Sequence, residues 1–247
     1  MKYLNLRGCE INEKARNDFL FSCQHLESLC LYGLNLPTQT IKSICLQNGK
    51  TLKKLDRSSN NHKFAPSRGK GFSYNWRNTQ LKESRKLKLE SIQDIAYNCV
   101  ELTELNLAFI SLSEDSLICL AKNLTPKILK LSLESTPIRD EHVEALVIRC
   151  NKITELDLSF CEKITNVALT NIIENLKSTL QKLALFSCWG IIAGGSDLTS
   201  LYQLKSMPKL RYLGVKGIEN EMKSLETQLP EMAINKDVYT IAEFRVL

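Results

Sequence analysis

The chain has 247 residues, of which 43% are apolar and 24% charged, and its formal net charge is +6. These proportions are ordinary for a soluble globular protein, and no run approaches the roughly 18 apolar residues that a membrane-spanning helix needs. The charge is local, because nine Lys or Arg and only two Glu lie between Arg57 and Glu90. The rest of the chain is close to neutral, so the global charge does not indicate a nucleic-acid partner. The first residues also lack a signal-peptide core, which predicts an intracellular protein.

A short pattern recurs along the chain. NCVELTELNLAF at 98–109 returns nearly unchanged as RCNKITELDLSF at 149–160. Aligning every copy on its Leu-x-Leu pair places the first leucines at Leu4, Leu29, Leu55, Leu105, Leu131, Leu156, Leu183 and Leu213. Most steps are 25 or 26 residues and the last two are 27 and 30, which is typical of a leucine-rich repeat. The interval from Leu55 to Leu105 equals two steps, so we expect one degenerate copy between them.

Each repeat predicts a short strand followed by a helix. Alternate strand residues share a face, so the two leucines are expected inside and the residues between them outside. The helical spacing predicts buried stripes of Phe19, Leu20 and Cys23, of Ile41, Ile44 and Cys45, and of Val143, Leu146 and Val147. No repeat can bury its apolar face alone. We therefore predict an α/β leucine-rich-repeat solenoid (horseshoe), with parallel strands on the concave face and helices on the convex face.

The predicted organisation has four parts. These are N-terminal leucine-rich repeats at 1–56, an irregular basic insertion or degenerate repeat at 57–86, C-terminal leucine-rich repeats at 87–218, and a capping segment at 219–247. Arg57 occupies a position that is Leu or Val in the other copies, and a charge there would be costly to bury. We therefore expect a long loop to open at Arg57. A nucleic-acid contact by the aromatic residues interleaved with basic ones in this segment is the less favoured alternative.

The nine cysteines predict neither disulfides nor a metal site. Their number is odd, and no CxxC pair or Cys/His cluster has zinc spacing. They recur at fixed places in the repeat, for example Cys99 and Cys150 before a strand and Cys161 and Cys188 after one. Because free Cys packs as a small hydrophobe, they are interpreted as core residues in a reducing compartment.

No catalytic constellation is visible in the sequence. Only three histidines occur, His25, His62 and His142, and none belongs to a G-x-S-x-G, P-loop or HExxH motif. The acidic residues on the strands are spaced by the repeat and not by paired-carboxylate chemistry. We therefore predict a protein that is not an enzyme, with no catalytic residue, no cofactor and no metal.

The predicted functional feature is the concave surface. Phe109, Phe160, Phe186 and Tyr212 are expected there on four of the last five strands, as a column of aromatic anchors for a peptide or protein. The candidate protein-binding residues are Glu104, Asn106, Phe109, Lys130, Ser132, Glu134, Glu155, Asp157, Phe160, Lys182, Phe186, Tyr212 and Lys216. Further outward positions are Asn5, Arg7, Cys30 and Tyr32.

The stretches NCVELTELNLAF, RCNKITELDLSFCEKIT and LYQLKSMPKLRYLGVKGI resemble the cysteine-containing repeats of F-box/LRR proteins. That family supplies substrate receptors of SCF-type cullin-RING ubiquitin ligases. The resemblance covers 87–247 well and 1–56 loosely. It implies a non-catalytic receptor for a phosphorylated cell-cycle regulator, in the nucleus and cytoplasm, assisted by a Cks-type accessory subunit at the last repeats. Phe109 matches a concave aromatic position of the family.

Two departures from the family pattern shape these expectations. The repeats begin near residue 3 with no F-box before them, which indicates a truncated chain or one missing a preceding domain. Binding of a Skp adaptor is therefore expected only if an F-box lies upstream. The chain also stops at Leu247, without the long tail that folds over the concave face in the family. The alternatives are a leucine-rich-repeat scaffold or inhibitor-type protein unrelated to ubiquitin, and a GTPase activator using Arg7.

Overall fold

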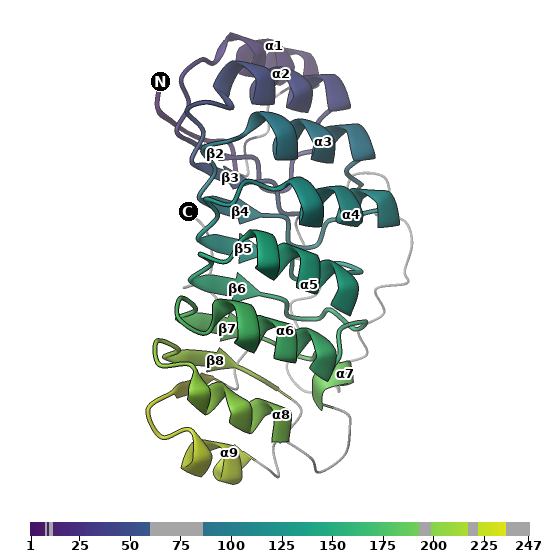
Figure 1. Ribbon diagram of the computed structural model, residues 1–247. Helices are drawn as coiled ribbons and strands as arrows, with labels where there is room; N and C mark the ends of the chain where they lie inside the picture. The colour runs from purple at the N-terminus through teal and green to yellow at the C-terminus, as the bar shows by residue number, and fades with distance from the viewer. Residues whose placement is uncertain (8, 10–11, 60–85, 193–198, 217–221, 236–247) are drawn as a thin grey trace, which may run out of the picture.

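The computed structural model describes residues 1–7, 9, 12–59, 86–192, 199–216 and 222–235. Within these residues a single sheet contains nine parallel strands in chain order (Figure 1). The strands are β1 (Tyr3–Asn5), β2 (Ser28–Cys30), β3 (Lys54–Asp56), β4 (Glu104–Asn106), β5 (Lys130–Ser132), β6 (Glu155–Asp157), β7 (Lys182–Ala184), β8 (Tyr212–Gly214) and β9 (Ala233–Asn235). The helices are α1 (Glu13–Ser22), α2 (Thr38–Asn48), α3 (Leu89–Asn98), α4 (Glu114–Asn123), α5 (Asp140–Arg149), α6 (Asn166–Leu176), α7 (Trp189–Ile192), α8 (Thr199–Tyr202), a 3-10 helix (Gln203–Ser206) and α9 (Met222–Gln228).

All strands pair in one constant register. The middle residues align from strand to strand, Leu29 with Leu55, Leu55 with Leu105 and so on up to Ile234 of β9. These side chains point into the solenoid, and most of them are fully buried. The predicted leucine-rich-repeat solenoid is therefore confirmed, including the eight strand centres predicted from Leu4 to Leu213.

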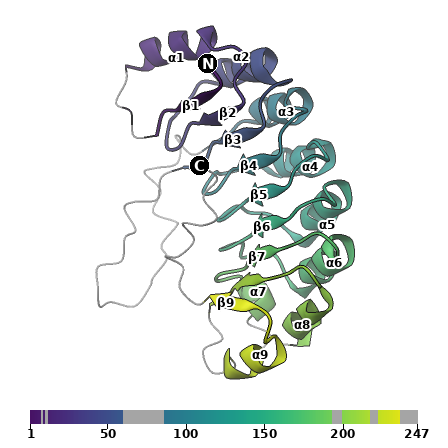
Figure 2. The same cartoon turned by 90° about the vertical axis from the view of Figure 1, so that its left-hand side faces the viewer.

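The helices line one side of the sheet, and the stack is curved with the helices outside (Figure 2). The stripe of Ile41, Ile44 and Cys45 on α2 is buried as predicted. The expected burial of Phe19 is wrong, because this side chain is 40% exposed on α1, the first helix of the row. None of the described helices is long and apolar enough to cross a membrane.

Among the described residues, no strand lies between β3 and β4 in the sheet. β3 pairs directly with β4, with Lys54 opposite Glu104 and Asp56 opposite Asn106. The chain rejoins the repeat at Lys86, which bridges to Ser111 of the next repeat, and α3 follows. The prediction of a degenerate copy here is therefore wrong, and the extra length lies between a strand and its own helix. Residues 60–85, including the predicted basic and aromatic contacts, lie outside the described residues.

Eight of the nine cysteines are buried as predicted, but Cys9 is exposed, so the core interpretation is wrong for Cys9. Two of the buried thiols show a recurring hydrogen bond. Cys161 Sγ donates to the Leu133 carbonyl at 3.3 Å, and Cys188 Sγ donates to the Leu158 carbonyl at 3.0 Å, in each case one repeat back. Burial raises the pKa of the Cys161 thiol to about 12, which keeps it protonated and unreactive at neutral pH. The structure thus adds a bonding role to the packing role predicted from sequence.

Candidate functional site

The first residues of the strands form a row of alternating charge on the concave face. From β3 to β7 the row is Lys54, Glu104, Lys130, Glu155 and Lys182. Lys54 Nζ lies 2.9 Å from Glu104 Oε1. Glu155 carboxylate oxygens lie 3.2 Å from Lys130 Nζ and 3.9 Å from Lys182 Nζ. Four predicted site residues are thus brought together, and as half-buried ion pairs they link neighbouring repeats.

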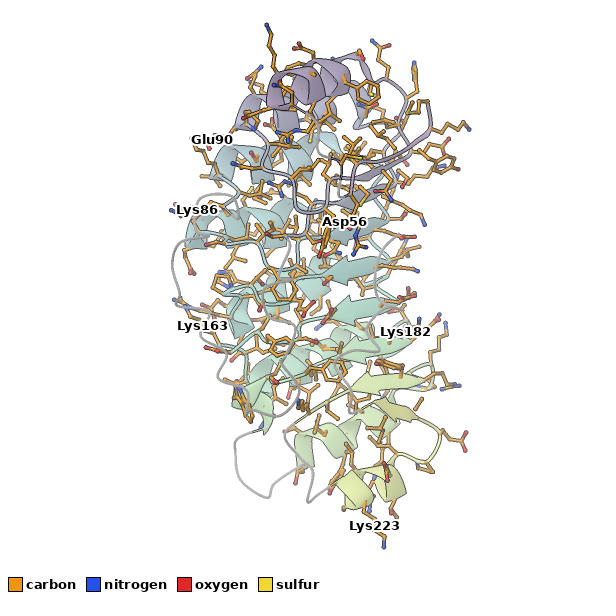
Figure 3. The ribbon with its side chains drawn as sticks, turned by 180° about the vertical axis from the view of Figure 1, so that it is seen from behind. Asp56, Lys86, Glu90, Lys163, Lys182 and Lys223 are labelled. Carbon is orange, nitrogen blue, oxygen red and sulfur yellow. The ribbon has the colours of Figure 1, made fainter. Side chains whose placement is uncertain are left out.

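The third residues of the strands have a different role. Asn106 Oδ1 accepts the Ala108 backbone N–H at 3.0 Å, and Asp157 Oδ1 accepts the Ser159 N–H at 2.9 Å. Asp56, labelled in Figure 3, does the same for Ser58. A short side-chain acceptor two residues before the N–H is the bond that defines an Asx turn. These residues fix the bend by which the chain leaves the concave face.

Burial corrects the expectation that these third positions face solvent. Asp157 is only 1% exposed, and Asn106 and Ser132 are also buried. The hydroxyl of Ser132 donates to Asp157 Oδ2 at 3.4 Å, so neighbouring turns are joined laterally. Burial raises the pKa of the Asp157 carboxyl, and the hydrogen bonds from Ser159 and Ser132 partly oppose that rise. These residues hold the face together from below its surface.

Phe109 and Phe160 occupy the same unusual place in their repeats. Each follows the strand centre by four residues and has a left-handed backbone, with φ of 60° and 59°. Gly33 occupies the equivalent place in the second repeat, with φ of 73°. Ser135 and Ser187 also occupy this place, with φ of 58° and 54°, so the left-handed turn belongs to the repeat and does not by itself mark the two aromatic residues as functional. The two rings are half-buried at the edge of the concave face, where a partner could reach them.

Phe186 is not an exposed anchor. Its side chain is fully buried and packs with Ala184, while half-buried Phe160 and Tyr212 pack against it. Gly214 leaves the space for this ring, because a Cβ there would collide with Phe186. Phe186 follows its strand centre by three residues, unlike Phe109 and Phe160, and so it stands at a different place in the repeat. It supports the rings of Phe160 and Tyr212 from beneath.

The predicted site therefore divides into an accessible set and a supporting set. Half-buried side chains are Glu104, Phe109, Lys130, Glu134, Glu155, Phe160, Lys182, Tyr212 and Lys216. Buried ones are Asn106, Ser132, Asp157 and Phe186. The first set offers charges of both signs and three aromatic rings, which is a surface suited to a peptide or protein.

Arg7, considered above as a GTPase-activating residue, takes part in a local contact instead. Its guanidinium lies 4.3 Å from the centre of the Tyr32 ring, in a cation–π arrangement between the first two repeats. This contact explains both residues as packing partners at the N-terminal end of the face.

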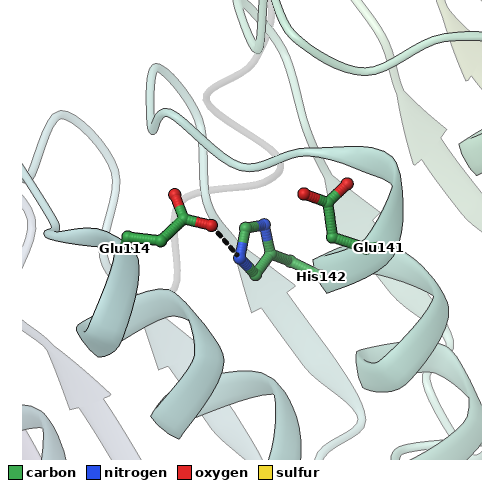
Figure 4. Close-up of side chains that lie close together, drawn as sticks. All are labelled: Glu114, Glu141 and His142. Atoms are coloured by element: carbon green, nitrogen blue, oxygen red, sulfur yellow. Dashed lines mark ion pairs between the residues drawn. The ribbon is translucent and has the colours of Figure 1, made fainter.

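A cluster at the helix starts was missed by sequence reasoning. Glu114 and Glu141 flank the buried His142, and their ligand atoms lie within 4.8 Å of one another (Figure 4). His142 Nε2 lies 3.1 Å from Glu114 Oε1, and Arg139 Nη1 lies 3.4 Å from the same oxygen. Beside it, Asp140 accepts the Thr165 backbone N–H at 2.7 Å. The starts of α4, α5 and α6 are thereby tied together.

This cluster has the composition of a metal site but the hydrogen bonding of a helix cap. The Arg139 backbone N–H donates to His142 Nδ1 at 3.2 Å, so Nδ1 must be the unprotonated nitrogen. Nε2 then carries the proton; it lies near Glu114 Oε1 but makes no hydrogen bond with the described residues. A metal-ligating histidine has the reverse arrangement, in which the second nitrogen donates to an acceptor. The signal in the sequence is the 25-residue spacing of Glu114 to Arg139 and of Asp140 to Thr165.

The stacked repeats and their concave face define a leucine-rich-repeat interaction module, of the type found in F-box/LRR proteins. The family described as the SKP2 LRR domain matches residues 75–243, and the chain belongs to that family. The resemblance seen in the sequence is therefore confirmed. It extends to the S-phase kinase-associated F-box protein, through NCVELTELNL and the ending MPKLRYLGVKGI.

A solved structure with the same fold is the crystal structure of a Rad7 and Elc1 complex in yeast, with a TM-score of 0.64 and 15% identity. The alignment covers 92% of this chain and 54% of that chain, so the chain spans about half the length of this structural relative. No curated protein matches the chain.

Proposed function

We propose that this chain is the non-catalytic substrate-recognition part of an SCF-type cullin-RING ubiquitin ligase, which selects a cell-cycle regulator for ubiquitin-dependent degradation. The observation that carries the proposal is the family match over 75–243. The concave face supports it, because Phe109, Phe160 and Tyr212 offer aromatic anchors beside lysines and glutamates. Such mixed, partly apolar surfaces are typical of protein recognition.

The partners follow from the same family. The substrate is a protein that carries a phosphate, and a Cks-type accessory subunit binds at the last repeats, around β7 and β8. A Skp adaptor joins only if an F-box lies upstream of the repeats. The protein acts in the nucleus and cytoplasm, where ligases of this type work.

A binding comparison tests the recognition surface. Phe109→Ala in the intact gene product is expected to lower recovery of the substrate at least about tenfold, the effect of one hot-spot residue. Ile148→Ala is the matched control, because Ile148 is 55% exposed on α5, on the convex side. Affinity purification with quantitative mass spectrometry measures both. Equal recovery from the two variants would contradict the assignment of this face.

The ligase role needs its own experiment. If an F-box lies upstream of the repeats, the full-length protein is expected to co-purify with a Skp adaptor and a cullin, and its loss should lengthen the half-life of the captured substrate. Substrate capture by the concave face with no adaptor and no change in half-life would instead identify a scaffold unrelated to ubiquitin.

A further inference from the structure

Arg57 breaks the pattern of the solenoid interior. The equivalent residue in the preceding repeat is Leu31 and in the following repeat is Leu107, both buried. Arg57 keeps that inward place, since its backbone N–H donates to the Asn106 carbonyl at 2.9 Å, as Leu31 does to Asp56. Its side chain is only 2% exposed. The expectation that this charge would avoid burial is therefore wrong.

The Arg57 guanidinium has no partner for two of its nitrogens. Nε and Nη1 are buried and make no hydrogen bond. Burial lowers the pKa of Arg57 to about 10, so the group remains charged at neutral pH. A buried charge without an ionic or hydrogen-bonding partner costs several kcal/mol, and an arginine rarely escapes that cost by losing its proton.

The adjacent aspartate does not supply the missing partner. Successive strand residues point to opposite faces, so Asp56 lies on the concave side and Arg57 inside. Asp56 Oδ1 accepts the Ser58 N–H at 2.9 Å, and Asp56 Oδ2 lies 3.7 Å from Cys30 Sγ. Both carboxylate oxygens are thus engaged away from the guanidinium.

The other charge near Arg57 is of the same sign. Asp56 raises the pKa of Arg57, and Arg16, in the first turn of α1, lowers it to a smaller extent. Arg16 Nη2 donates to the Asn35 carbonyl at 2.9 Å, but its Nε is buried and unpartnered. Together the two guanidinium groups have three buried nitrogens with no acceptor among the described residues, namely Arg57 Nε, Arg57 Nη1 and Arg16 Nε, a combination that an anion would relieve.

We propose that Arg57 and Arg16 form a binding site for a small oxyanion at the N-terminal end of the solenoid. Guanidinium groups match the oxygens of phosphate and carboxylate, and two of them favour the more highly charged phosphate. Because Arg57 is enclosed, the occupant is a free ion or a single group, not a folded surface. The site is separate from the concave face and does not rest on the ligase role proposed above.

Titration of the purified full chain with potassium phosphate tests the proposal, with potassium chloride at equal ionic strength as reference. Isothermal calorimetry and thermal unfolding are the measurements. Saturable heat and a rising Tm are expected in phosphate and not in chloride. An acetate arm tells a phosphate site from a general carboxylate site, since a phosphate site should bind acetate at least tenfold more weakly.

Arg57→Leu is expected to weaken phosphate binding at least tenfold while folding normally, because leucine occupies this place in other repeats. Arg16→Met should weaken phosphate binding as well. Arg16 lies on α1, so this variant leaves the strands unchanged. Arg211→Leu is the control, because it removes the same charge at the far end, where Arg211 donates to the Pro208 carbonyl. No saturable phosphate effect in the unmodified chain, or equal titrations for Arg57→Leu and the control, would overturn the proposal.

Discussion

The first repeat and the repeats around β4 to β7 are built on the same pattern but packed differently. In the central repeats Leu105, Leu156 and Leu183 are completely buried. At the N-terminal end Leu4 is only half-buried and Phe19 is exposed. In a solenoid each repeat contacts only its neighbours, so a terminal repeat has one interface where a central one has two. Position in the stack therefore modifies what the repeat sequence alone would give.

The largest expected effect tests this difference directly. Leu156→Ala is expected to cost about 2–5 kcal/mol of unfolding free energy, because the fully packed centre of β6 cannot collapse around the cavity. Leu4→Ala removes the same atoms from a half-buried edge strand and should cost about 1 kcal/mol. Urea unfolding measures both. Equal costs would show that the two regions are packed alike.

The packing of the C-terminal repeats depends on Gly214, because its lack of a side chain leaves room for Phe186. Gly214→Ala is expected to cost about 1–3 kcal/mol, because the new Cβ would push against the Phe186 ring. In a Phe186→Ala background the same change should cost almost nothing, since the obstructing ring is gone. A double-mutant cycle by chemical unfolding gives the coupling. An unchanged cost in that background would refute the contact as the cause.

At the N-terminal end, one substitution is expected to raise the free energy of unfolding instead of lowering it. In chloride buffer, Arg57→Leu should raise the unfolding free energy by about 1–3 kcal/mol, since an unpaired buried charge is replaced by the residue that the other repeats use. Arg211→Leu serves as control and should change it little. Loss of stability in Arg57→Leu would show that the guanidinium is already compensated.

The smallest effect concerns the buried Asp157. Its pKa is raised in the folded state, so it favours folding most below its unfolded pKa of about 3.9. That contribution is lost as the pH rises through the folded pKa. Asp157→Asn keeps the acceptor for Ser159, as Asn106 does for Ala108, and should gain no more than about 1 kcal/mol at neutral pH. Unfolding from about pH 4 to about pH 7 should depend less on pH in the variant. An unaltered pH dependence would exclude Asp157 as its source.

The sequence predicted the features that follow from the repeat period, such as the strand centres. Leu105 and Leu156 lie at the strand centres as expected, because a strand flanked by its own helix needs that apolar pair in each copy. The interval from Leu55 to Leu105 suggested a degenerate copy because its length equals that of two repeats. The pairing of β3 with β4 shows one repeat with extra chain, and length alone cannot separate these cases.

The candidate site was predicted less completely, for physical reasons. Asn106 and Asp157 are outward positions by alternation, but their side chains bend back to the turn, and alternation does not encode that bond. Phe186 shares a residue type with Phe109 and Phe160 yet stands one place earlier in its repeat. Arg57 was recognised as anomalous, but its burial depends on the neighbouring repeats holding the backbone in register.

The alternating charges on the concave face also constrain how the repeat array can change in length. Removing the repeat that contains β5 would bring Glu104 opposite Glu155, and removing the one that contains β6 would bring Lys130 opposite Lys182. Like charges directly opposite each other destabilise neighbouring strands. Removing β5 and β6 together would restore an opposite-sign pair, Glu104 with Lys182. This part of the chain should therefore tolerate the gain or loss of two repeats together better than the gain or loss of one.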